Sequence, residues 1–137
     1  MSKIFLSYRF TGEDPKQLDE VLGTIRKKLI ASGHDIFCSF FMEDYFRKKA
    51  MTSDEIYDYC LERQAESDTF LVFVKSEHKS TGMQKESEKA VQLGQKYVLL
   101  IRNDLDFFYL RSLAHTTIEY KDMPDLYQRL DTIDFAT

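Results

Sequence analysis

The stretch TFLVFVK, residues 69–75, constrains the fold of this chain more than any other. Its centre is an unbroken run of β-branched, aromatic and other apolar side chains, without the polar alternation of a strand that has one wet face. A strand of this kind is covered on both faces, as in a parallel sheet between two layers of helices. We therefore expect residues 69–75 to form the central strand of a sheet.

The rest of the chain alternates between two kinds of segment. Short apolar runs predict further strands at 4–8, 35–40, 97–102 and 116–120. Helical spacing and helix-start signals predict helices at 14–32, 52–66, 82–94 and 123–133, with a shorter helix in FFYLRSLA. Because strands that alternate with helices pair in parallel through right-handed crossovers, we expect a three-layer α/β domain with about five strands.

Length and composition indicate one globular domain over residues 1–137. The net charge of -4 gives no reason to expect nucleic-acid binding, which needs a basic face. We find no apolar run of signal-peptide or membrane-spanning length, so we expect a cytoplasmic protein without a membrane partner. Cys38 and Cys60 lack metal-ligand spacing and are interpreted as free thiols, and we expect neither a metal nor a cofactor.

Ligands of such sheets bind beyond the C-terminal ends of the strands, which directs attention to the loops after residues 8, 40 and 75. The first loop carries Arg9 and Gly12 just before a helix, and the third carries Ser80, Thr81 and Gly82 just before another. Helix N-termini attract anions, so both loops are candidate phosphate sites. The alternative is that Ser80 or Thr81 simply caps its helix.

Glu86 lies on the border of the apolar stripe of the helix at 82–94. It comes three residues after Met83 and four before Ala90, so it is near the inward face, whereas Glu88 points away. The spacing leaves two interpretations open: a buried carboxylate with a chemical role, or a surface residue paired with Lys85 or Lys89.

The segment from Ser67 to Ile101 resembles the core signature of the nucleoside 2-deoxyribosyltransferase family, including its 2′-deoxynucleoside 5′-phosphate N-hydrolase branch. The matching positions are Ser67-Asp68, Gly82, Glu86, Ala90 and Gly94. KIFLSYRF at the start and TTIEYKDMPDLYQRL at the end are also similar to the family. The resemblance implies a flavodoxin-like α/β/α sandwich with a five-stranded parallel sheet, and cleavage of the N-glycosidic bond of a nucleoside or nucleotide, with transfer to another base or to water.

In this resemblance Glu86 is the nucleophile that attacks C1′ of the sugar and forms a glycosyl-enzyme. The residues implied to hold the substrate are Ser7, Tyr8, Arg9, Phe10, Gly12, Ser80, Thr81 and Gly82. His78 is a candidate phosphate contact or acid. The aromatic candidates for stacking on the base are Phe10, Phe40, Phe41, Tyr45 and Phe46. The related enzymes are dimers or larger, so we expect a homo-oligomer in which Tyr109, Arg111 and Ser112 serve a partner's site.

The second carboxylate of the family departs from the pattern. Its position, eight residues before Asp68, is occupied by Cys60. Asp58 is two residues away on a different helical face, and it is the remaining candidate for the second catalytic carboxylate.

Two alternatives remain. FLSYRFTGED, residues 5–14, resembles the opening of a Toll/interleukin-receptor (TIR) domain, and some TIR domains cleave NAD with a glutamate on the corresponding helix. The other alternative is a nucleotide-binding or oligomerising module that has lost catalysis with the second carboxylate.

Overall fold

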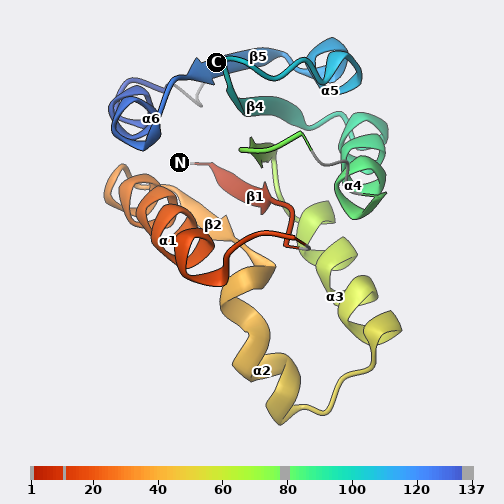
Figure 1. Cartoon of the computed structure of the whole chain (residues 1–137). Coiled ribbons are helices and arrows are strands. Elements are labelled where there is room, and N and C mark those ends of the chain that lie inside the picture. The colour runs from red at the N-terminus through yellow and green to blue at the C-terminus, as the bar shows by residue number, and fades with distance from the viewer. Residues whose placement is uncertain (1, 11, 78–80, 134–137) are drawn as a thin grey trace.

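The computed structural model describes residues 2–10, 12–77 and 81–133. Five strands form one sheet in the order β2-β1-β3-β4-β5, and every neighbouring pair is parallel (Figure 1). The strands are β1 (Lys3–Ser7), β2 (Asp35–Phe37), β3 (Thr69–Val74), β4 (Lys96–Arg102) and β5 (Thr116–Tyr120). The flavodoxin-like fold predicted from the sequence is confirmed.

Helices cover both faces of this sheet. They are α1 (Pro15–Ala31), α2 (Glu43–Lys48), α3 (Ser53–Ala65), α4 (Thr81–Gln92), α5 (Phe108–Leu113) and α6 (Met123–Leu130), with a 3-10 helix η1 (Ser39–Met42) before α2. One core packs α1 and α6 against the sheet, and the other packs α3, α4 and α5 against the opposite face (Figure 1). The short α2 lies beyond the sheet beside α3.

β3 is the central strand, as its sequence predicts. All six of its residues are buried, and it pairs with β1 on one side and with β4 on the other. Its alternate side chains enter the two cores, Leu71 on the α1 side and Phe70 on the α4 side. An unbroken apolar run is stable there because neither face meets water.

The helix-end signals act as the sequence predicts. Asp14 caps α1 by accepting a hydrogen bond from the Lys16 N–H, and Thr52 and Glu55 form a reciprocal capping box at the start of α3. Gly33 and Gly94 follow α1 and α4 with φ of 89° and 68°, a left-handed conformation that glycine adopts without steric cost.

Two predicted boundaries are wrong. The strand expected at 35–40 ends at Phe37, because β1 and β2 pair only as far as Phe5 opposite Phe37, and the chain then turns into η1. The helix expected at 123–133 ends at Leu130. The other elements agree with expectation to within two residues, and α2 was not predicted.

Within the described residues, we find no helix that is both long enough and apolar enough to span a membrane.

Candidate functional site

The strand order places a candidate site at the C-terminal ends of β1 and β3. The chain passes from β1 to β2 on one side and then crosses to β3 on the other side. The connections therefore diverge at this point and leave a crevice at the carboxyl edge of the sheet. β1 delivers Ser7 and Tyr8 to this edge, and α4 follows β3 with Glu86 in its second turn.

Glu86 points toward the end of β1. Its Oε1 accepts a hydrogen bond of 2.7 Å from the hydroxyl of Ser7. Burial raises the pKa of Glu86 to about 7, and the Ser7 hydrogen bond opposes this rise. The inward position predicted from the helical spacing is therefore correct, and the carboxylate is not a surface partner of Lys85 or Lys89.

Three weakly acidic side chains surround this carboxylate. Burial raises the pKa of Tyr8 above its ordinary value, that of Cys38 to about 12 and that of Cys60 to about 11. The Glu86 charge is a further cause of the raised pKa in each of the three. All three are therefore neutral near pH 7, and Glu86 is the group among them whose charge changes in that range.

Cys60, not Asp58, is the α3 side chain that faces Glu86. Cys60 is half-buried and packs against the core beneath α4, and the charge of Glu86 acts on it. Asp58 is two residues earlier, about 200° around the helix, and its side chain is exposed. The structure does not bring Asp58 to the carboxylate, so the role predicted for it as the second catalytic group has no geometric support.

Aromatic side chains from the end of β1 and from η1 cluster beside the Glu86 site. The ring of Tyr8 meets Phe40 edge-on at 5.8 Å, and Phe40 also lies near Phe10 and Phe41 at 6.4 and 5.3 Å. The Ser39 hydroxyl donates a hydrogen bond of 3.3 Å to the Tyr8 hydroxyl. Phe10 is 55% exposed, so its ring is accessible to a ligand. These rings are the stacking candidates that the fold keeps near the site.

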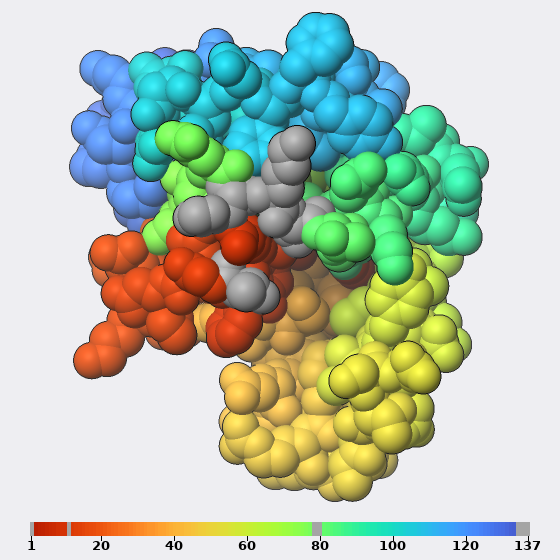
Figure 2. Space-filling model, turned by 45° about the vertical axis from the view of Figure 1, so that its right-hand side comes forward, coloured from red at the N-terminus to blue at the C-terminus, as the bar shows by residue number. Residues whose placement is uncertain are grey.

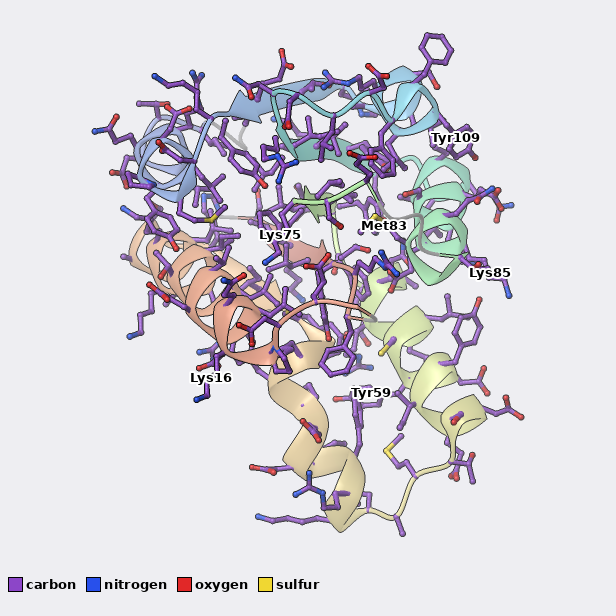
Figure 3. All side chains as sticks on the ribbon, in the orientation of Figure 1. Lys16, Tyr59, Lys75, Met83, Lys85 and Tyr109 are labelled. Atoms are coloured by element: carbon purple, nitrogen blue, oxygen red, sulfur yellow. The ribbon has the colours of Figure 1, made fainter. Side chains whose placement is uncertain are left out.

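Tyr45 and Phe46, the other two stacking candidates, have a structural role. Both rings lie 5.7 Å from Tyr59 of α3, and together they hold α2 against α3. Figure 3 shows Tyr59 between these two helices.

Figure 2 shows a hollow in the surface between the orange η1–α2 segment, the yellow-green α3 and the green α4, with the red end of β1 above it.

The first loop holds a partly buried cation. Arg9 Nη1 is buried without a hydrogen-bond partner among the described residues. It borders a small cavity of about 10 Å³, which Glu13 and Lys75 also line. Lys75 and Glu13 pair with each other at 3.5 Å. Gly12 has a φ of 82°, and a Cβ at this position would lie 3.5 Å from Arg9 Nη2, so the glycine backbone lies close to the Arg9 guanidinium.

Thr81 and Gly82 form the exposed first turn of α4, whereas Ser80 and His78 lie outside the described residues. Figure 3 shows Met83 pointing from α4 toward the sheet and Lys85 pointing away from it. The first turn therefore lies at the carboxyl edge of the sheet, as predicted, and the predicted roles of Ser80 and His78 remain predictions.

Arg111 and Ser112, which the resemblance assigns to a partner's site, form hydrogen bonds within this chain. Arg111 donates to the carbonyl oxygens of Leu105 and Asp106, each at 2.6 Å, and pairs with Glu119 at 3.3 Å. The Ser112 hydroxyl donates to the Tyr109 carbonyl. These bonds anchor the loop before α5.

Sequence reasoning missed Gln64, Ser39 and Cys38. The Gln64 amide is fully buried and donates a hydrogen bond of 2.8 Å to the main-chain carbonyl of Glu86. A polar residue on the buried face of α3 is the only signal that could have found it. Ser39 and Cys38 were assigned to a strand, and the correct turn into η1 brings them to Tyr8 and Glu86.

Both cysteines are free, as predicted. Within residues 2–10, 12–77 and 81–133, no cluster of His, Cys, Asp and Glu could hold a metal ion.

No family model and no curated protein matches the sequence. Among solved structures, the chain is similar to the CMP N-glycosidase BcmB of Clostridium botulinum, with a TM-score of 0.71 and 19% identity over 94% of this chain and 97% of that one. It is also similar to a 2-deoxyribosyltransferase from Bacillus psychrosaccharolyticus, with a TM-score of 0.68 and 19% identity over 98% and 94% of the two chains. A conserved protein from Enterococcus faecalis matches with a TM-score of 0.64 and 14% identity over 95% and 97%.

At these identities the likeness establishes the fold, over nearly the full length of both chains in each pair. The resemblance to TIR domains remains a prediction from the sequence.

Proposed function

We propose that this chain belongs to the nucleoside 2-deoxyribosyltransferase family and cleaves the N-glycosidic bond of a nucleoside or nucleoside 5′-monophosphate, with Glu86 as the nucleophile. The observation that carries the proposal is the Glu86 carboxylate itself. It is half-buried at the carboxyl edge of a parallel sheet, accepts a hydrogen bond from Ser7 and lies near three neutral side chains. The full-length likeness of fold to an N-glycosidase and to a deoxyribosyltransferase supports the same reaction class.

The reaction has two balanced steps. In the first, a Glu86 oxygen attacks C1′ while the C1′–N bond breaks, and the bonding electron pair leaves with the base nitrogen, which takes a proton. The nearby negative charge stabilises the oxocarbenium-like transition state, and the product is a glycosyl ester. In the second, water or the nitrogen of another base attacks C1′, the attacking group loses a proton, and the carboxylate is released.

Charge in the first loop favours a phosphorylated substrate. Arg9 Nη1 has no partner among the described residues, whereas nearby Lys75 already pairs with Glu13. A buried guanidinium N–H without a partner is costly, and an anion that reaches Nη1 gains a charge-assisted hydrogen bond. In this proposal Arg9 and Gly12 hold the 5′-phosphate together with the first turn of α4, and Phe10 and Tyr8 contact the base.

The experiment is to measure base release by liquid chromatography from deoxynucleosides, their 5′-monophosphates and NAD. Wild type is compared with Glu86→Gln and with Glu88→Gln, which neutralises an exposed carboxylate on the same helix. We expect release from one class of nucleoside substrate, lost in Glu86→Gln and kept in Glu88→Gln. Release that survives Glu86→Gln would overturn the proposal, and release from NAD alone would support the TIR-like alternative.

A second candidate function is a nucleotide-binding module without turnover. The observation that favours it is the neutral thiol of Cys60 beside Glu86, where the resemblance expects a carboxylate. If the wild-type protein binds nucleotide but releases no base, the test is to measure base release by the Cys60→Asp variant. If the missing carboxylate is the cause, Cys60→Asp gains base release; an unchanged inactive protein speaks against that explanation.

The proposal includes self-association. Phe108 at the start of α5 is 83% exposed, and Tyr109 and Leu105 contribute to the groove that it borders. Large exposed aromatic side chains are typical of interfaces. Light scattering on the purified chain tests this part, and a monomer at all accessible concentrations would contradict it.

A further inference from the structure

Within the part of the chain that the structure describes, two side chains from outside α4 form hydrogen bonds with Glu86. One is Ser7 at the end of β1, whose hydroxyl donates to Glu86 Oε1 at 2.7 Å. The other is Gln64 near the end of α3, whose amide donates to the Glu86 main-chain oxygen at 2.8 Å. The side chain and the backbone of one residue are thus held by two separate elements.

Ser7 provides a rigid point of attachment. It is 2% exposed, and the pairing of its main chain with Val72 of the central strand fixes the position of its Cα. Among the described residues, only Oε1 of the carboxylate accepts a hydrogen bond, which leaves Oε2 available to a reacting carbon. A hydrogen bond to one oxygen therefore orients the other.

Gln64 fixes the backbone at the same residue. It is fully buried, and its own carbonyl accepts a hydrogen bond of 2.6 Å from Gln95, whose amide also reaches the Ser67 carbonyl. These bonds tie the C-terminal end of α3 to the segment that follows α4. The helix carrying Glu86 consequently has little freedom to slide or rotate against α3.

We propose that Ser7 and Gln64 are the positioning residues of the Glu86 carboxylate, Ser7 through its side chain and Gln64 through its main chain. The proposal rests on the proposed function of Glu86. Precise orientation of a nucleophile contributes to rate because a reacting atom displaced by about 1 Å loses roughly a hundredfold in reactivity.

The charge of Glu86 reports on Ser7 directly. Among the described residues, the titratable groups on which the charge of Glu86 acts are Tyr8 from the first loop, Cys38 from the segment before η1 and Cys60 from α3. The pKa of Cys38 is about 12, that of Cys60 about 11, and that of Tyr8 is raised. None of them changes charge near the pKa of Glu86, so a titration near neutral pH belongs to Glu86.

The first test is the titration of Glu86 by NMR of carboxyl-labelled glutamate, assigned with Glu86→Gln. We compare wild type with Ser7→Ala and with Ser87→Ala, a control that removes a fully buried hydroxyl of the neighbouring residue bonded to Tyr97 instead. We expect Ser7→Ala to raise the Glu86 pKa by about 1 unit and Ser87→Ala to leave it in place. Identical titrations in wild type and Ser7→Ala would overturn the role of Ser7.

The second test compares Gln64→Met with Ser67→Ala, which removes another side-chain-to-backbone hydrogen bond at the same end of α3 without touching Glu86 or Gln64. We expect roughly a tenfold lower kcat with little change in KM for Gln64→Met, measured per folded protein, and a much smaller loss for Ser67→Ala. Equal losses in the two variants would show that Gln64 contributes stability alone.

Because the titration needs no turnover, it tests the position of Glu86 independently of catalysis. A chain that releases no base from any substrate, yet shows the Ser7→Ala shift, contradicts the proposed function and keeps the positioning of Glu86.

Discussion

At the residue scale, the Glu86 carboxylate combines a half-buried position with a pKa of about 7, raised by desolvation and lowered in part by Ser7. Only the anionic form can attack C1′. Base release therefore depends on pH through the physiological range, unlike that of an enzyme with an ordinary glutamate.

The first prediction is a rate profile that rises with pH. Below the Glu86 pKa, kcat/KM should increase about tenfold per pH unit, and it should level off above about pH 7.5. Steady-state rates from pH 5 to pH 9 on the best substrate measure this. A profile that stays flat from about pH 5.5 upward would mean that the carboxylate is already ionised there or takes no part.

The sequence revealed part of this site. The spacing of Met83, Glu86 and Ala90 is local to one helix, so it gave the inward position of Glu86 correctly. The Ser7 hydrogen bond joins residues 79 positions apart, and no local pattern indicates which β1 side chain meets α4. Cys60 was placed by resemblance, and the helical period shows why Asp58 cannot replace it.

At the element scale, one glycine within α1 and one just after it have opposite requirements. Gly23 lies within the helix and has open space around its Cα, whereas Gly33 follows the helix with a φ of 89°. Alanine favours a helix interior, but a side chain in the left-handed region is strained.

The second prediction is that Gly23→Ala stabilises the chain by about 0.5 to 1 kcal/mol and that Gly33→Ala destabilises it by about 1 kcal/mol. Urea denaturation of both variants beside wild type gives the two free energies of unfolding. The same sign of change in both would contradict the assignment of Gly33 as the end of α1.

The third prediction concerns α2, which forms one wall of the surface hollow between α2, α3 and α4. Tyr59 contacts Tyr45 and Phe46, so Tyr59→Ala should loosen α2 and cost about 2 to 4 kcal/mol. Amide hydrogen exchange across residues 43–48 should become faster than in wild type. Tyr57→Ala, on the same helix but 45% exposed, is the matched control and should leave that exchange unchanged.

The alternation of elements could be predicted because each buried strand and each amphipathic helix carries its own period. The irregular segment between β2 and α2 could not be predicted from its sequence. Its aromatic side chains pack against Tyr8 and Tyr59, which are remote in sequence, so the run at 35–40 looked like a continuous strand.

At the scale of the whole molecule, one sheet has a core on each face, and α1, α3, α4, α5 and α6 pack in these cores, which supports the proposal that residues 1–137 form one domain. Stability of such a unit responds to every buried charge. Since the pKa of Glu86 is raised from 4.5 to about 7 on folding, the folded state binds more protons than the unfolded state between these values.

The fourth prediction follows from this difference in proton binding between the folded and unfolded states. The contribution of Glu86 to stability is fully present below about pH 4.5, is lost as pH rises through about 7, and amounts to about 1 to 3 kcal/mol. Glu86→Gln should therefore be more stable than wild type at about pH 8 by roughly this amount and show a smaller difference at about pH 5. Equal free energies of unfolding at both pH values would contradict a buried, high-pKa carboxylate.

The central claim is that Glu86 forms a covalent bond to the sugar, and the most direct measurement is the mass of the trapped enzyme. A 2′-fluoro-2′-deoxy analogue of the best substrate slows the second step, because fluorine at C2′ destabilises the oxocarbenium-like transition state. Intact mass spectrometry should show one added glycosyl group, peptide mapping should place it on Glu86, and Glu86→Gln should show none. An adduct on another residue, or base release from the analogue without any adduct, would contradict the account.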